Sequence, residues 1–140
     1  MKRIGKQHKN YTVNLQRKNN MRKAISKVVR LQVLSRVGGL CGYCGSRPEK
    51  LQVDHIHPVC RAYRLDGDVN DISNLMPSCG SCNNYKLNMT LEQFRRDLGR
   101  SIELARKYSV NFRNAERFGL ISINPPEKIV FYFEKIILDN

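Results

Sequence analysis

The chain has 140 residues and a mass of 16.2 kDa, which is enough for one compact domain and too little for two. Hydrophobic residues make up 41% of it, so wholesale disorder is excluded, and no apolar run approaches the roughly 20 residues of a membrane-spanning helix. Lysine and arginine total 25 against 12 acidic residues, which gives a formal charge of +13. No apolar segment follows the basic N-terminus, so we expect no secretory signal and a soluble protein of the cytoplasm.

The first element is a polar, basic arm over residues 1–19, before a single domain over residues 20–140. No acidic residue occurs before position 41, whereas eleven basic residues do: Lys2, Arg3, Lys6, Lys9, Arg17, Lys18, Arg22, Lys23, Lys27, Arg30 and Arg36. Such a one-signed segment is typical of a surface that binds a polyanion, and binding of this kind weakens steeply with salt. The alternative is a solvated basic tail without a partner.

The next elements are short. Apolar residues at helical spacing predict a helix from about 20 to 37, ended by Gly38 and Gly39. Alternation predicts a strand over 51–54, and a long loop with a turn at Asp66-Gly67 follows over about 58–73. We expect a second extended piece over 74–77 and a helix that begins near Cys82.

The remaining elements are predicted to be helical and then β. Thr90-Leu-Glu-Gln93 has the form of a capping box and predicts a helix start at Thr90. Further helices are expected over about 101–108 and 111–118, the second ending at Gly119. At the C-terminus, the residues 120–123 and 129–134 are predicted to form a β-hairpin turned by Asn124-Pro125-Pro126.

Four of the five cysteines form two C-x-x-C pairs, Cys41 with Cys44 and Cys79 with Cys82. Two such pairs, a few tens of residues apart, predict a structural zinc site with four thiolate ligands. The glycines beside them permit the tight turns that direct two sulfurs at one ion. The fifth cysteine, Cys60, is assigned no function.

Between the two pairs, Asp54 and His55 end the predicted strand, where successive side chains point in different directions. A histidine with an ordinary pKa of about 6.5 is a natural base for activating water. The Asp54 carboxylate is a hard ligand suited to a divalent cation such as Mg²⁺, and Asn83 can add a carbonyl oxygen. Hydrolysis of a phosphodiester needs both functions.

The order Asp54-His55-Ile56-His57-Pro58, then Asn74-Leu75, then Cys79-x-x-Cys82-Asn83-x-x-Lys86 resembles the HNH nuclease family, over about residues 37–88. The resemblance implies a ββα-metal core with structural zinc, so the expected fold class is α+β, with a helical and hairpin extension over about 90–136. It implies that Asp54 and Asn83 hold Mg²⁺ or Mn²⁺ and that His55 activates water. It also implies that Asn74 braces the loop and helps to orient His55. The implied protein is a stand-alone endonuclease of phage or bacterial type that acts on DNA, most simply double-stranded DNA.

Several assignments stay open in the sequence. Asn74 could instead cap a turn, and Asn84 could replace Asn83 as a ligand. His57, Lys86, Arg61 and Arg64 are candidate phosphate contacts or ordinary surface residues. The alternative function is a zinc ribbon that binds nucleic acid without cutting it, which explains the cysteines and the arm but leaves Asp54, His55, Asn74 and Asn83 unexplained. Oligomeric state, specificity and biological role have no signal in the sequence.

Overall fold

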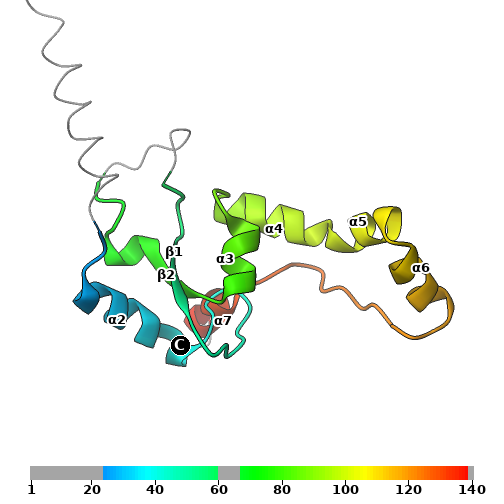
Figure 1. The fold of residues 1–140 in the computed structure, drawn as a ribbon, viewed down its shortest axis with the longest axis horizontal. Helices are drawn as coiled ribbons and strands as arrows, with labels where there is room; N and C mark the ends of the chain where they lie inside the picture. The colour runs from blue at the N-terminus through cyan, green and yellow to red at the C-terminus, as the bar shows by residue number, and fades with distance from the viewer. Residues whose placement is uncertain (1–23, 60–66, 139–140) are drawn as a thin grey trace, which may run out of the picture.

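The computed structural model describes residues 24–59 and 67–138, and its elements are shown in Figure 1. Cys60, Arg61, Arg64 and the predicted arm over 1–19 lie outside these residues. No helix in the described ranges is long and apolar enough to cross a membrane.

The first described helix, α2 (Lys27–Ser35), begins later than predicted because Ser26 caps it. The Ser26 hydroxyl accepts a hydrogen bond from the Val29 amide, which satisfies one of the free amides of the first turn. A 3₁₀ turn, η1 (Arg36–Gly39), follows, and Gly38 and Gly39 have φ angles of 67° and 69°, which end the helix as expected. Arg36 then donates hydrogen bonds to the carbonyls of Ile72 and Leu75. These bonds join the 3₁₀ turn to the segment that begins the second strand.

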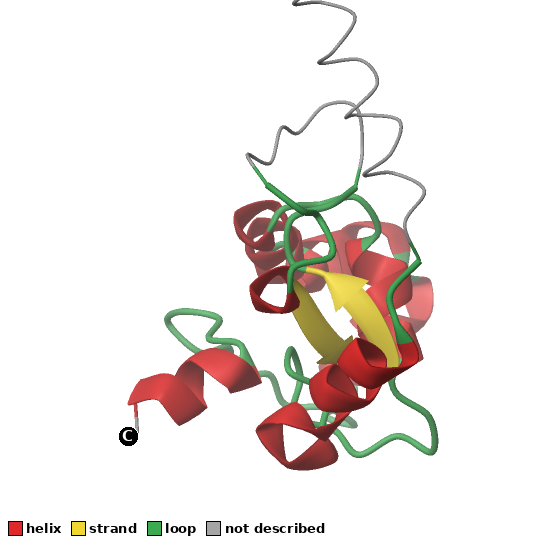
Figure 2. Cartoon of the chain, turned by 90° about the vertical axis from the view of Figure 1, so that its left-hand side faces the viewer, coloured by secondary structure: helices red, strands yellow, loops and turns green. Residues whose placement is uncertain are grey.

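A small antiparallel sheet of two strands lies at the centre, with helices on either side of it (Figure 2). Strand β1 (Gln52–His55) pairs with β2 (Leu75–Ser78) in a register that sets Asp54 opposite Met76 and His55 opposite Leu75. The 3₁₀ turn η2 (Ile72–Asn74) leads into β2, and helix α3 (Gly80–Lys86) leaves it. The two strands followed by α3 are the ββα arrangement that the sequence predicts, within an α+β fold.

The C-terminal half is helical, and its first helix begins where the sequence predicts. Helix α4 (Leu91–Gly99) opens with a complete capping box between Thr90 and Gln93. Helices α5 (Ser101–Tyr108) and α6 (Val110–Arg117) extend away from the sheet before the chain returns (Figure 1).

The predicted C-terminal hairpin is wrong, since residues 120–131 contain no strand and α7 (Tyr132–Leu138) follows them. Leu120 is 77% exposed, so it has no packed surface on which a strand could form. The amides of Tyr132 and Phe133 donate instead to the carbonyls of Tyr43 and Gly42, at 3.0 and 2.8 Å. These bonds join the start of α7 to the first cysteine pair.

The hydrophobic core is small and rich in aromatic residues. Tyr43, Phe94 and Phe131 are buried, with ring centroids 5.3–5.5 Å apart in stacked and edge-to-face pairs. They come from the first cysteine pair, from α4 and from the segment before α7, so three parts of the chain distant in sequence meet beside the cysteines.

Candidate functional site

The four paired cysteines form a metal site. The sulfur atoms of Cys41, Cys44, Cys79 and Cys82 all lie within 4.8 Å of one another. Those of Cys44 and Cys79 are 3.8 Å apart, which matches the edge of roughly 3.8 Å in a tetrahedron whose metal–sulfur bonds are about 2.3 Å. Four thiolates in this arrangement suit zinc, as the sequence predicts.

Each cysteine pair is shaped by backbone contacts. The Gly42 amide donates to the Pro77 carbonyl at 2.8 Å, and a Cβ at Gly42 would lie 2.3 Å from the Met76 sulfur. Any other residue at this position would require the buried Met76 side chain to move. In the second pair, the Cys79 sulfur accepts a hydrogen bond from the Cys82 amide and caps the start of α3.

The thiols influence one another. Hydrogen bonding with Cys82 lowers the pKa of Cys41 to about 4, and the same bond raises the pKa of Cys82. Thiolate is the form that binds metal, so the group holds at least one ready ligand at neutral pH.

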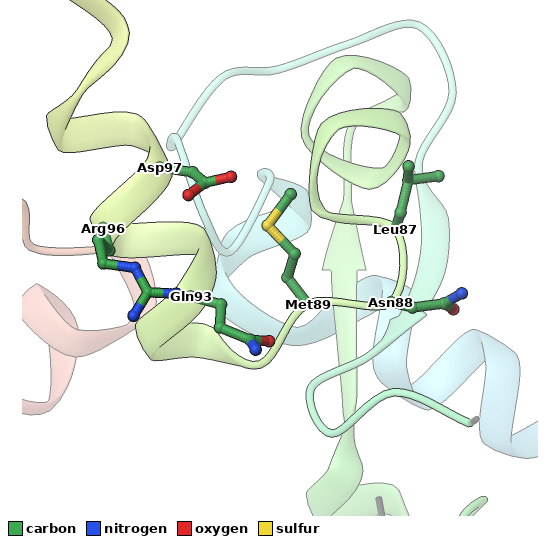
Figure 3. Close-up of a pocket in the computed structure, with 6 residues that line it drawn as sticks. All are labelled: Leu87, Asn88, Met89, Gln93, Arg96 and Asp97. Carbon is green, nitrogen blue, oxygen red and sulfur yellow. The ribbon is translucent and has the colours of Figure 1, made fainter. Parts of the chain in front are cut away.

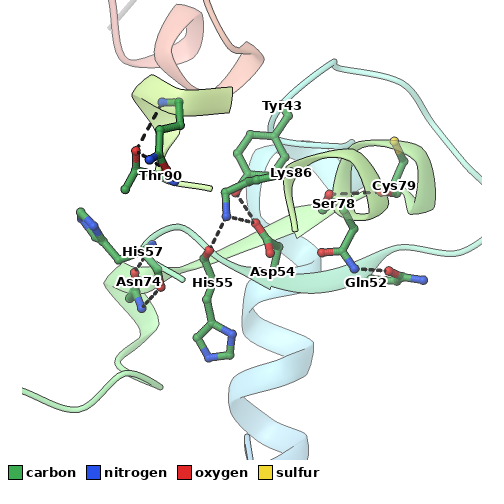
Figure 4. A network of polar contacts seen from close by, with 12 residues as sticks. Tyr43, Gln52, Asp54, His55, His57, Asn74, Ser78, Cys79, Lys86 and Thr90 are labelled. Atoms are coloured by element: carbon green, nitrogen blue, oxygen red, sulfur yellow. Dashed lines mark hydrogen bonds and ion pairs between the residues drawn. The ribbon is translucent and has the colours of Figure 1, made fainter. Parts of the chain in front are cut away.

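One face of β1 lies against α3, and Asp54 is its buried centre (Figure 4). The Tyr43 hydroxyl donates to Asp54 Oδ2 at 2.6 Å, and Lys86 Nζ lies 2.9 Å from the same oxygen. Burial, and then the Asp54 charge, raise the pKa of Tyr43, so its hydroxyl stays a donor. Both contacts fall on Oδ2, and within the described residues no hydrogen bond ends on Oδ1.

Asn83 faces the same strand one helical turn before Lys86. Its side-chain nitrogen donates to Gln52 Oε1 at 2.6 Å, and Gln52 lies two residues before Asp54 on β1. Asn83 and Lys86, three positions apart, lie on one face of α3. Asn83 contacts Gln52 and Lys86 contacts Asp54, which lie on one face of β1. Asn84 is exposed, so the structure favours Asn83 as the residue directed toward this face.

His55 presents its backbone and its ring to different neighbours. Its carbonyl accepts a hydrogen bond from Lys86 Nζ at 2.7 Å, while its ring extends away from Lys86 (Figure 4). The ring nitrogen Nε2 lies 2.9 Å from Asn70 Oδ1. His55 as a whole is half-buried.

Asn74 is buried and holds the loop that follows β1. Its Oδ1 accepts from the His57 amide at 2.8 Å, and its Nδ2 donates to the carbonyls of Val69 and His57. The contacts of Asn74 are therefore with backbone groups, whereas Asn70 contacts the His55 ring. The His57 side chain is exposed.

Lys86, which the sequence leaves open between a phosphate contact and an ordinary surface position, is buried. The Lys86 side chain has no exposed surface, and its ammonium group is used by Asp54 and by the His55 carbonyl. A buried lysine needs such partners, because an unpaired charge in the interior is costly.

Three residues of this site had no clear signal in the sequence. Tyr43 lies between two cysteines, where any residue fits the pattern, and Gln52 is indicated only by its alternation with Asp54. Asn70 precedes η2 in the loop and matches no motif.

A hollow in the surface lies away from this site. It has a volume of about 440 Å³ at the junction of α3 and α4 and is lined by Leu87, Asn88, Met89, Gln93, Arg96 and Asp97 (Figure 3). None of these is a predicted site residue.

Comparison with known proteins agrees with the geometry. Residues 41–88, which hold both cysteine pairs, both strands and α3, match the family model described as HNH endonuclease. This segment is therefore an HNH domain, and the resemblance found in the sequence is confirmed for it.

One solved structure is similar, the crystal structure of the Type II-C Cas9 enzyme from Actinomyces naeslundii, with 23% identity and a TM-score of 0.44. The match covers 79% of this chain and 13% of that one. No curated protein matches the chain.

Proposed function

We propose that the protein is a metal-dependent endonuclease that hydrolyses phosphodiester bonds of DNA. One observation carries this proposal. Asp54 and His55 are adjacent at the end of β1 inside the HNH domain, and each is held by its own partners, Asp54 by Tyr43 and Lys86 and His55 by Asn70. The end of a strand with only a structural role does not need two adjacent polar side chains with separate partners.

His55 serves as the general base. Its ring takes a proton from a water molecule while the water oxygen bonds to phosphorus, and the bond from phosphorus to the leaving oxygen breaks. The neutral form of the ring is the one that this step requires.

Asp54 and Asn83 would hold Mg²⁺ or Mn²⁺. The bonds from Tyr43 and Lys86 fix Oδ2 of Asp54 and leave Oδ1 as the ligand atom, and Asn83 contributes its carbonyl oxygen from α3. These are the hard oxygen ligands that such cations prefer. The bound cation would stabilise negative charge on the leaving oxygen.

The substrate contacts follow from charge and exposure. His57 is exposed two residues beyond His55 and would contact a phosphate of the substrate. The basic residues before position 41 supply a non-specific attraction to the DNA backbone, and Arg61 and Arg64 add to it from the loop. Double-stranded DNA is the simplest polyanion with this chemistry.

The test is nicking of supercoiled plasmid by the full chain with Mg²⁺, Mn²⁺ or EDTA, with zinc content measured in each sample. His55→Ala is expected to slow cleavage by about 10²- to 10⁴-fold while DNA binding and zinc persist. Asp54→Asn is a better probe than alanine because it fills the same space beside buried Lys86. Its activity is expected to recover partly at higher Mg²⁺. Lys50→Ala, an exposed lysine of the same domain, is the control.

The second candidate is a zinc module that binds nucleic acid without cutting it, and the four-cysteine site supports it. Wild-type protein that binds DNA but cuts none of the DNA substrates would favour this candidate. Cleavage by His55→Ala at the wild-type rate would overturn the proposed mechanism.

A further inference from the structure

The His55 ring is held by a residue outside the HNH motif. Nε2 of His55 lies 2.9 Å from Oδ1 of Asn70, fifteen positions further along the chain. The sequence assigns the orientation of this ring to Asn74, but the side chain of Asn74 bonds to the backbone of His57 and Val69.

Asn70 itself has a fixed position. Its amide donates to Asp68 Oδ1 at 3.0 Å, and the Asp71 amide donates to the Asp68 carbonyl at 2.9 Å, which closes the turn. The neighbouring Val69 carbonyl accepts a bond from the buried Asn74 side chain at 2.9 Å. The side chain of Asn70 is therefore presented to His55 by a turn that is hydrogen-bonded to Asn74, the last residue of η2.

The chemistry of the two groups decides which ring nitrogen carries hydrogen. An amide oxygen only accepts hydrogen bonds, so His55 Nε2 must donate. A neutral imidazole carries one N–H, and with the hydrogen on Nε2 the lone pair is on Nδ1.

We infer that Asn70 is a positioning residue for His55, which fixes the ring in the Nε2–H tautomer and directs Nδ1 toward the reacting water. This inference rests on the proposed nuclease function for its catalytic part. The two asparagines then divide the task, since Asn74 holds the backbone after His55 and Asn70 holds the ring.

The tautomer is measured by ¹⁵N and ¹H NMR of the zinc-loaded full chain labelled at its three histidines, at a pH where the ring is neutral. The His55 signals are assigned by their loss in His55→Ala. In the wild type we expect the Nε2–H tautomer, with an Nε2–H proton that exchanges slowly enough to be seen. In Asn70→Ala this proton has lost its acceptor, so it should exchange with water too rapidly for its signal to be observed. Asn70→Asp keeps an oxygen acceptor and should keep the signal.

Plasmid nicking by the same variants gives the second readout. Asn70→Ala is expected to lower kcat by roughly 10- to 100-fold with little change in KM, as for other residues that orient a reacting group. Asn70→Asp should recover most of this loss, and Asn88→Ala, an exposed asparagine after α3, should match the wild type. Asn88→Ala and the Asn70 variants should retain zinc, which shows that the domain is folded.

An Nδ1–H tautomer in the wild type, or an unchanged His55 spectrum in Asn70→Ala, would overturn the inference. The spectra report on Asn70 even if no DNA is cut. Failure of this inference and failure of the proposed function are therefore separate results.

Discussion

Lys86 Nζ lies 2.9 Å from Asp54 Oδ2, and the whole Lys86 side chain is buried. The same ammonium group donates to the His55 carbonyl at 2.7 Å. One side chain of α3 therefore fixes both residues of the Asp54–His55 pair relative to the helix that carries Asn83. Cys79 and Cys82 of the four-cysteine cluster lie at the other end of α3, so this short helix connects that cluster with the end of β1.

Replacing Lys86 by methionine is expected to destabilise the fold by about 3–5 kcal/mol, because Asp54 is left buried without its counter-charge. The double variant Asp54→Asn/Lys86→Met should be destabilised less, since neither charge remains. The measurement is urea unfolding of zinc-loaded protein. Lys107→Met, on the exposed surface of α5, is the matched control and should unfold like the wild type. A Lys86→Met variant as stable as that control would contradict the buried pair.

Zinc is expected to be present at one ion per chain and to be needed for the fold. Cys79→Ser removes one ligand and the cap of α3 together, so the variant should release zinc and unfold the central domain. The measurements are elemental analysis and circular dichroism. Mutation of Ser81, an exposed residue of the same helix, to alanine is the control. Stoichiometric zinc in a folded Cys79→Ser variant would argue against a four-cysteine site.

Deletion of residues 1–19 is expected to weaken DNA binding and to make its salt dependence shallower. The deletion removes six cationic side chains, Lys2, Arg3, Lys6, Lys9, Arg17 and Lys18, and no acidic one. For each phosphate that is no longer neutralised, the slope of log K against log salt should become shallower by roughly 0.9. Binding is measured by fluorescence anisotropy at several salt concentrations, with zinc content as the check of folding. An unchanged slope would mean that the arm is a tail without a partner.

The sequence predicted those parts of the fold that depend on local chemistry. The capping box at Thr90, the Gly38-Gly39 stop and the pairing of the cysteines are all present. The capping box and the helix stop depend on residues a few positions apart. The pairing of the cysteines depends on ligand chemistry, because four thiolates that bind one ion must lie together.

The sequence was misleading where a distant contact decided the outcome. The sequence predicts the second strand of a hairpin over 129–134, but hydrogen bonds to Tyr43 and Gly42 and the burial of Phe131 determine the structure there. The burial of Lys86 could not be predicted, because its partner Asp54 lies far away in sequence, on β1. Asn70 could not be found at all, since only the turn before η2 brings it to His55.

The last prediction concerns the ion pair that fastens α7 to α4. Arg95 contacts both carboxylate oxygens of Glu134, at 3.1 and 2.6 Å, and lies 4.6 Å above the Phe131 ring. Partial burial alone would raise the pKa of Glu134, but the bonds from Arg95 and from the Phe131 amide outweigh it, so the net pKa is lowered. A lowered pKa in the folded state stabilises the fold at pH values above the unfolded pKa of about 4.3. This stabilisation disappears as the pH falls through the folded value.

Glu134→Gln keeps an oxygen acceptor for the Phe131 amide at the start of α7 and removes only the charge. At pH 7 it is expected to cost about 1.5–3 kcal/mol of unfolding free energy, the size of hydrogen bonds to a charged group. The difference from wild type should shrink below about pH 4.3, where the unfolded carboxylate takes up a proton. Glu103→Gln is the control, because its contact with Arg100 is 4.0 Å long and exposed, and it should change stability much less at any pH. Urea unfolding of both variants and the wild type between pH 3 and 7 gives the comparison. If the loss of unfolding free energy in Glu134→Gln stayed constant over this range, the ion pair would not be what holds α7 in place.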